Sequence, residues 1–375
     1  MSYGVIAYAF VSMRNAVLTL AVGALACCAS AQTPRPEKQY EIMKLADGVH
    51  AFLWKNPLEN PIEGNALIVV NRDDVVLIDT GVFSETGEIL AREIRKLTPL
   101  PVRYVVNTHW HDDHHGGNSA ILKHWPGAEV IGHRDTRTDI IERSYKVRPK
   151  TIAGYEKSLE KYERWKATGK DEDGKPLDAG RMERVADLVA FLSADLPKFK
   201  GLRETPPTLT FADKMVLTRG ERRIELIWLG LGNTRGDIVV FLPKERIVAS
   251  GDLFVLPVPF AFGSYYEHWV DTLGKLDALE ADIIVPGHGP VQRDRVALKS
   301  VRGLLEALVN EVKAAVATGA TLEETRKRVK LADWREKFAG DDKTRQAAFS
   351  SFVLAAATER LWRQARGEAD PPPSE

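Results

Sequence analysis

The chain has 375 residues, enough to bury a large core in one enlarged domain or in two domains. It carries 52 basic and 52 acidic residues, so its formal net charge is zero. No overall field draws such a chain to nucleic acid or to an anionic membrane surface. We therefore expect a small-molecule partner and no nucleic-acid partner.

The amino terminus has the pattern of an export signal. Arg14 precedes the apolar run Ala16–Ala26, and Ala29-Ser30-Ala31 offers the small residues that a signal peptidase cuts. The apolar run is shorter than the roughly 20 residues of a membrane-spanning helix. We expect residues 1–31 to be a signal peptide, residues 32–39 to be a linker, and the mature protein to be secreted or periplasmic without stable membrane insertion. A retained membrane anchor is the alternative.

The region after the signal is predicted to be a layered α/β domain over residues 40–290. Between Tyr40 and Phe83, runs of β-branched residues bounded by turn residues predict strands. The segment Glu85–Leu97 predicts a helix, and Val102–Asn107 predicts a buried strand that leads into a histidine-rich segment. Strands that alternate with helices are typical of a layered α/β architecture. The strands expected before the helix cover residues 49–53, 65–70 and 75–78.

Residues from about 134 to 204 are charged and helical in pattern. The segment Gly169–Gly174 separates two amphipathic runs, Tyr155–Trp165 and Met182–Leu192. We interpret this region as a helical insertion that caps a site; a solvated helical pair without a role in substrate access is the alternative. Strands resume from about Thr208 to Val285. Residues 291–366 then predict a helical extension, and residues 367–375 a disordered tail.

Four of the nine histidines lie within His109–His115. In an extended segment residues i and i+2 point the same way, so His109 and His111 can converge on one cation, with Asp113 on the same side. His114 then faces a second position, and a turn forced by Gly116-Gly117 would fold the group over two metals. His115, next to an expected ligand, is interpreted as a neighbour. A solvated loop is the alternative.

Imidazole nitrogen and carboxylate oxygen are the donors that zinc accepts when thiolates are missing. Both cysteines, Cys27 and Cys28, fall inside the expected signal peptide, so the mature chain would have no thiol. We therefore expect one or two zinc ions, with manganese or iron as alternatives.

The segment Asn107–His114, which reads NTHWHDDH, resembles the H-x-H-x-D-H signature of the metallo-β-lactamase superfamily. Three further segments resemble that superfamily in its chain order: Asp79-Thr80-Gly81, Gly251-Asp252 and Pro286–Gly289. The resemblance covers about two thirds of the chain. It implies an αββα four-layer sandwich with the site along one edge of the paired sheets.

The resemblance also implies a ligand set. Metal one would take His109 and His111, metal two would take Asp113, His114 and His288, and Asp252 would bridge the two. Asp79 is expected to accept a hydrogen bond from a metal-bound histidine or to steady the loop. A simple turn residue is the alternative for Asp79.

One segment departs from the superfamily pattern. Leu229–Asp237, LGLGNTRGD, resembles G-x-x-H-T-x-G-D, but Asn233 stands at the histidine position. An amide oxygen is neutral and a weaker donor for zinc than imidazole, so we expect metal one to be the looser. Three states are compatible with this: Asn233 as a weak ligand, water in its place, or a single ion at metal two. A structural Asn233 in the turn is a further alternative.

The resemblance implies a metal-dependent hydrolase in which a metal-activated water, its pKa lowered from about 15.7 towards about 7, attacks a carbonyl. The residues expected to carry the reaction are Asp113, Asp252 and Asn233. A β-lactam, a lactone or another ester-like compound is the expected substrate. Aspartate at position 252 lowers the weight of an antibiotic substrate, whereas export raises it. A glyoxalase II-like thioesterase and a non-catalytic metal-binding module are the alternatives.

The loop after Asp252 is rich in proline and aromatic residues. Phe260, Phe262, Tyr265 and Tyr266 are expected to line an apolar substrate pocket beside the metals. Plain packing under the C-terminal helices is the alternative. The Ala-rich segment of residues 347–357 is a candidate surface for a homo-oligomer.

Overall fold

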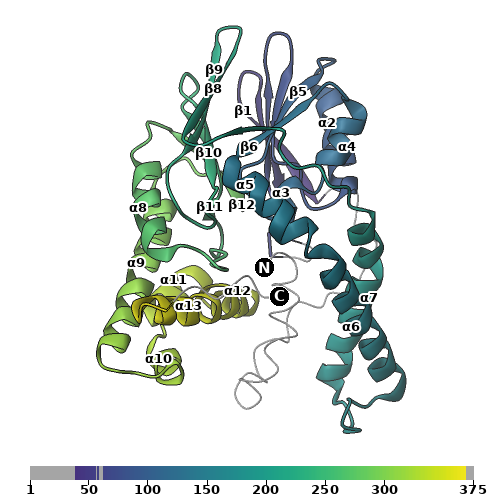
Figure 1. The fold of residues 1–375 in the computed structure, drawn as a ribbon, viewed down its shortest axis with the longest axis vertical. Coiled ribbons are helices and arrows are strands. Elements are labelled where there is room, and N and C mark those ends of the chain that lie inside the picture. The colour runs from purple at the N-terminus through teal and green to yellow at the C-terminus, as the bar shows by residue number, and fades with distance from the viewer. Residues whose placement is uncertain (1–38, 56, 59–61, 369–375) are drawn as a thin grey trace.

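The computed structural model describes residues 39–55, 57–58 and 62–368 (Figure 1). The expected signal peptide with both cysteines, all but the last residue of the linker, and most of the predicted tail lie outside these residues. Two β-sheets face each other, and helices cover their outer sides. The fold is therefore the mixed α/β sandwich that the sequence predicts.

The first sheet has seven strands that follow one another in chain order. The strands from β1 to β4 pair antiparallel, and those from β4 to β7 pair parallel. Because β4 and β5 are parallel neighbours, their carboxyl ends meet at one edge of the sheet. The strands are β1 Tyr40–Ala46, β2 Val49–Trp54, β3 Ala66–Val70, β4 Val75–Ile78, β5 Val102–Val106, β6 Glu129–His133 and β7 Leu209–Phe211.

The second sheet has five strands in the order β12-β11-β10-β9-β8. All its pairs are antiparallel except β11 with β12, which run parallel. Strand β11 carries Asp252 within it. The strands are β8 Lys214–Arg219, β9 Arg222–Trp228, β10 Ile238–Leu242, β11 Ile247–Val255 and β12 Ile283–His288.

The core between the sheets follows from the alternation of side chains along each strand. In β2, Val49, Ala51 and Leu53 point between the sheets, where they join residues of β9 to β12. Phe52 points the other way and packs with Leu90 of α2 (Ser84–Leu97). A strand with apolar residues on both faces is thus buried from both sides, and the continuous apolar runs of the sequence reflect this.

Helices α2 and α4 (Asn118–His124) cover the first sheet, while α8 (Tyr266–Asp277) and α9 (Val296–Ala317) cover the second (Figure 1). The C-terminal helices are α10 Leu322–Arg328, α11 Ala332–Ala339, α12 Lys343–Ala348, the π-helix η2 Phe349–Ala355 and α13 Ala356–Ala365. In the Ala-rich segment, Ala348, Phe349, Val353 and Ala357 pack into the core that contains α8 and α9. The buried side of this segment therefore serves the chain's own core, and an oligomer contact on its other side stays a prediction.

The predicted helical insertion forms α5 (Arg134–Asp139), the π-helix η1 (Ile140–Tyr145) and the long hairpin of α6 (Arg148–Thr168) and α7 (Ala179–Gly201). The hairpin extends away from the sheets (Figure 1). Its base packs against the sandwich, because the rings of Phe199 and Phe83 lie 4.9 Å apart, edge to face.

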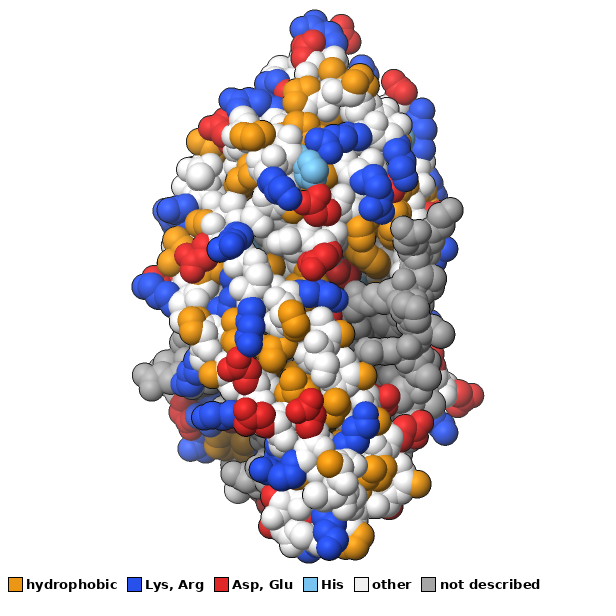
Figure 2. Space-filling model, turned by 90° about the vertical axis from the view of Figure 1, so that its right-hand side faces the viewer, with side chains coloured by type: hydrophobic (Ala, Val, Ile, Leu, Met, Phe, Trp, Pro, Cys, Tyr) orange, Lys and Arg blue, Asp and Glu red, His pale blue; other side chains and the backbone are white. Residues whose placement is uncertain are grey.

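Acidic, basic and apolar side chains are interspersed on the face of the molecule that Figure 2 shows. None of the described helices has the length and apolarity that a membrane crossing requires.

Candidate metal centre

Six side chains from segments far apart in the sequence meet at one edge of the sandwich. They come from the loop after β5, from the short helix α3 (Asp112–His115), from β11 and from the end of β12. Five of the six are buried, and His111 is half-buried. The side chains are His109, His111, Asp113, His114, Asp252 and His288, the set that the resemblance implied.

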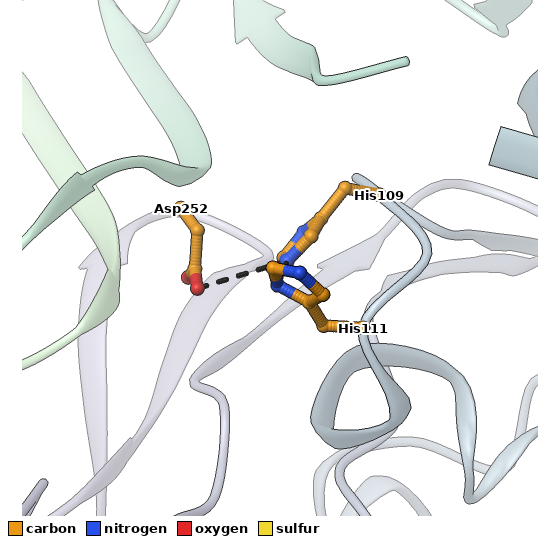
Figure 3. Close-up of side chains that lie close together, drawn as sticks. All are labelled: His109, His111 and Asp252. Carbon is orange, nitrogen blue, oxygen red and sulfur yellow. Dashed lines mark hydrogen bonds and ion pairs between the residues drawn. The ribbon is translucent and has the colours of Figure 1, made fainter. Parts of the chain in front are cut away.

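The first group consists of His109, His111 and Asp252. Figure 3 shows both imidazoles on the loop side and the carboxylate of Asp252 reaching towards them from β11. His109 Nε2 lies 2.9 Å from His111 Nδ1 and 3.6 Å from Asp252 Oδ2. Three nitrogen and oxygen donors thus face a common point.

The second group consists of Asp113, His114 and His288. Asp113 Oδ2 lies 3.3 Å from His114 Nε2 and 3.0 Å from His288 Nε2, and the two Nε2 atoms are 3.3 Å apart. Asp252 Oδ1 lies 3.2 Å from His114 Nε2 and 3.4 Å from His288 Nε2. Asp252 therefore turns one carboxylate oxygen towards each group.

The structure corrects the side on which the alternation of an extended segment places Asp113. That alternation put Asp113 beside His109 and His111, whereas the structure groups it with His114 and His288. The extended backbone ends at His111, and the helical turn of α3 begins at Asp112. The two-residue periodicity therefore stops before it reaches Asp113.

Gly116 and Gly117 are needed for close approach rather than for an unusual backbone. Their φ angles are −61° and −81°, within the ordinary right-handed region. A Cβ on Gly116 would lie 1.9 Å from the carbonyl oxygen of Val82, and one on Gly117 would lie 2.2 Å from that of Thr80. The predicted turn is present at these two residues, between α3 and α4, but the reason for the glycines differs: they let α3 lie directly against the segment after β4.

Asp79 lies directly behind the second group. Its Oδ2 is 2.8 Å from His114 Nδ1, and its two oxygens also accept hydrogen bonds from the backbone N–H and the hydroxyl of Thr108. If Nδ1–H of His114 donates to Asp79, the lone pair of Nε2 points into the group. Thr108 Oγ1 is also 3.1 Å from His109 Nδ1, a role that the sequence does not predict although Thr108 directly precedes His109.

The electrostatics of the two groups differ. Burial acts to raise the pKa of Asp113, but His114 and His288 hold it well below its usual range. Burial acts to lower the pKa of His288, yet Asp252 and Asp113 raise it to about 9. In the first group burial lowers the pKa of His111 to about 4. The second group thus attracts positive charge, while the first offers neutral imidazole.

This donor set fits divalent cations. Two Nε2 atoms that face each other at 3.3 Å, with Asp113 and Asp252 beside them, require a proton or a cation between them. Zinc accepts imidazole and carboxylate ligands without thiolate. The ligands lose their protons when a metal binds. The residues therefore fit one ion at each group, with Asp252 shared.

Asn233 is buried, and the nitrogen of its side-chain amide is hydrogen-bonded. Its Nδ2 donates a 2.5 Å hydrogen bond to the carbonyl oxygen of Phe260. Its Oδ1 has no hydrogen-bond partner among the residues that the structure describes. The amide oxygen, the atom able to coordinate a cation, is thus left available.

The predicted pocket residues have different surroundings. Phe260 packs against the second group, with its ring 4.9 Å from that of His288. Phe262 is half-buried, and half-buried Tyr265 lies under the guanidinium of Arg360. Tyr266 is fully buried in the core and donates a 2.8 Å hydrogen bond to the carbonyl oxygen of Ala261, so its assignment to a substrate pocket is corrected.

The C-terminal extension packs against the aromatic residues of the loop after β11. The ring of Phe352 in η2 lies 5.1 Å from Phe260 and 5.2 Å from Phe262. Phe352 does not stand out in the sequence, because an aromatic residue in an Ala-rich helix is typical of an ordinary core contact. Asn65 was also missed: its Nδ2 donates to the carbonyl oxygens of Pro286 and Gly289 and so fixes the backbone on both sides of His288.

Known proteins resemble this chain over the same region. Residues 60–288 match the family described as the Metallo-beta-lactamase superfamily. A linear primary-alkylsulfatase of a Pseudomonas species is 24% identical over 273 residues, which are 69% of this chain and 48% of the relative. A metallo-beta-lactamase type 2 of Bacteroides fragilis is 22% identical over 256 residues, 66% of this chain and 78% of the relative.

Among solved structures, a metallo-beta-lactamase from Pontibacter korlensis aligns with a TM-score of 0.49 and 22% identity over 72% of this chain and 99% of its own. The chain spans about half the length of the alkylsulfatase it matches. The family match covers residues 60–288 of 375 and includes all six clustered side chains. By this match, the chain belongs to the metallo-β-lactamase superfamily.

Proposed function

We propose that the protein is an exported metal-dependent hydrolase of a small molecule with a dinuclear site. The observation that carries the proposal is the position of Asp252. One of its oxygens faces His109, and the other faces His114 and His288. A single carboxylate between two sets of donors suits a pair of neighbouring ions.

Each ion would have its own ligands. His109 and His111 would hold the first, Asp113, His114 and His288 the second, and Asp252 both. When bound, zinc ions supply Lewis acidity and a hydroxide nucleophile at neutral pH; manganese and iron are alternatives. We assign the buried Oδ1 of Asn233 to the first ion as a weak, neutral donor. The first site is then the looser of the two.

The chain's own residues prepare the site in two ways. Asp79 fixes the ring and tautomer of His114 through the 2.8 Å contact with Nδ1. Phe260, packed against His288 and Phe352, shields one side of the second group from water. The carboxylates Asp113 and Asp252 carry the negative charge that balances the cations. Together with Asn233 they are the residues on which we expect the reaction to depend.

The proposed substrate is a carbonyl compound such as a β-lactam, a lactone or another ester-like molecule. The named activities of the relatives are consistent with cleavage of a cyclic amide or of a sulfate ester, so alkyl sulfates belong in the same test. A thioester is the alternative substrate, and a non-catalytic metal-binding module is the alternative function. The proposed location in the periplasm rests on residues 1–31, which the structure does not describe.

The experiment is a substrate panel before and after metal removal. A chromogenic β-lactam, a lactone, a thioester and an alkyl sulfate are offered to the purified mature protein, to the protein treated with a chelator, and to the treated protein given zinc, manganese or iron. We expect turnover of one class, its loss after chelation and its return with metal. If no class turns over with any metal restored, the metal-binding module is the better description.

Amino-terminal sequencing of the exported protein tests the location in the same preparation. We expect the mature chain to begin at Gln32, after Ala29-Ser30-Ala31. A chain that keeps Arg14 after export would show that the segment is retained as an anchor.

A further inference from the structure

The start of the helical insertion contacts the loop of the candidate ligands through residues that belong to neither ligand group. Trp110, between His109 and His111, packs with Ile140 and Tyr145 of η1. Asp112, between His111 and Asp113, turns its buried carboxylate away from the two groups and towards the insertion. His115 Nε2 lies 3.0 Å from the carbonyl oxygen of Trp110 and 3.2 Å from Asp112 Oδ1, outside both groups.

Asp112 is held by a short chain of donors from the insertion. The hydroxyl of Ser144 donates to Asp112 Oδ1. Arg148 Nη2 in turn donates to Ser144 Oγ over 3.0 Å and lies 3.5 Å from Asp112 Oδ1. The guanidinium of Arg148 also lies 4.6 Å from the centre of the Tyr145 ring. Each member is fixed by a second contact, so the donors reach Asp112 in one geometry.

The insertion has a second anchor on the loop that carries Asn233. Arg235 donates two hydrogen bonds of 2.9 Å to the carboxylate of Asp139, which is almost fully buried. Arg143 Nε lies 3.3 Å from the same carboxylate, and its guanidinium lies 5.6 Å from the centre of the Trp110 ring. Residues 139–148 therefore join the loop of His109 and His111 to the loop of Asn233.

The backbone between the two anchors is a π-helix, Ile140–Tyr145. Such wide turns are rare, and they occur frequently at functional sites. Because Asp112 lies between two candidate ligands, a shift of its backbone moves His111 of the first group and Asp113 of the second together. The contacts of Ser144 and Arg148 with Asp112, here called the brace, therefore act on both groups.

We propose that Ser144 and Arg148 are positioning residues that act through Asp112 to hold the metal ligands in place. The insertion then acts on the site through residues 139–148. This role does not depend on the distant part of the hairpin. The proposal rests on the proposed metal-dependent function, because a brace on ligands has an effect only where a metal binds.

The test compares Ser144→Ala with Ser158→Ala, and Arg148→Met with Arg181→Met. Ser158 lies on α6 and donates to the carbonyl oxygen of Gly154 in its own helix. Arg181 pairs with Asp171 at 3.2 Å and lies over Trp165, far along the same hairpin from Asp112. Each control thus removes a similar contact within the insertion without touching the metal-binding loop.

The readouts are the zinc dissociation constant, from competition with a chromophoric chelator, and the visible spectrum of the protein loaded with Co²⁺. We expect Ser144→Ala and Arg148→Met to weaken zinc binding by about 10-fold or more and to change the Co²⁺ spectrum, as losses of groups behind metal ligands do. The two controls should match the wild type in both readouts, even if the Tm of the metal-free protein falls in all four variants.

Wild-type zinc affinity and an unchanged spectrum in either Ser144→Ala or Arg148→Met would overturn the proposal. Since each variant tests the brace separately, one that fails to fold leaves the other to decide. A wild-type protein that binds no zinc would instead overturn the proposed function, and the brace with it.

Discussion

Asp252→Asn is expected to weaken the binding of both ions by more than about 100-fold and to reduce the proposed hydrolysis accordingly. The wild-type carboxylate faces His109 with one oxygen and His114 and His288 with the other. An asparagine offers one oxygen, and its NH2 group would face imidazole nitrogens that need an acceptor or a cation. Loss of groups that merely orient ligands costs about 10- to 100-fold in metal affinity, so loss of a shared ligand should exceed about 100-fold.

Metal content after gel filtration and competition titration measure this effect. Asp282→Asn is the matched control, because Asp282 directly precedes the neighbouring β12 and pairs with Arg246 at an exposed position. The control should keep the wild-type metal content. Two ions per chain in Asp252→Asn, bound with unchanged affinity, would show that Asp252 is not a shared ligand.

Asp79→Asn is expected to weaken metal binding by about 10- to 100-fold while the fold is retained. Asp79 accepts from the N–H and hydroxyl of Thr108 and lies 2.8 Å from His114 Nδ1. An asparagine has a single acceptor oxygen, so it cannot serve all three donors. Its backbone is tolerated, because residue 79 has φ 59° and asparagine adopts this left-handed region readily.

The measurement is again zinc competition, combined with thermal unfolding of the metal-free protein. Asp74→Asn provides the comparison: Asp74 is buried at the other end of β4, where it accepts a 3.0 Å hydrogen bond from Asn71 and pairs with Arg219. We expect Asp74→Asn to lower Tm without changing zinc affinity. If both variants lose stability equally and neither loses affinity, Asp79 is a turn residue only.

The sequence predicts the sandwich well because its signals are local. The segment Val102–Asn107 is apolar and β-branched, and the strand Val102–Val106 occupies it; the helix expected from Glu85 begins at Ser84 and ends at Leu97 as expected. The clustered residues could be named because their short motifs are specific in combination. Their convergence depends on the parallel pairing of β4 with β5 and of β11 with β12.

What the sequence could not predict depends on contacts between distant segments. The alternation of an extended segment put Asp113 beside His109 and His111, whereas the ligand set implied by the resemblance grouped it with His114 and His288; no local signal shows that the backbone turns helical at Asp112. Tyr266 was placed in a pocket because an aromatic residue carries no mark of whether it faces a core or a ligand. The bond from Ser144 to Asp112 spans 32 residues, and π-helices have no simple sequence period, so the brace is visible only in the fold.

Anomalous diffraction at the zinc edge, from crystals of the mature protein grown with zinc, tests the dinuclear centre most directly. We expect two peaks, one enclosed by His109, His111 and Asp252 and the other by Asp113, His114 and His288, with the weaker peak at the first group. A single peak at the second group would leave a mononuclear protein. No peak at either group, with zinc bound elsewhere or not at all, would contradict the metal centre itself.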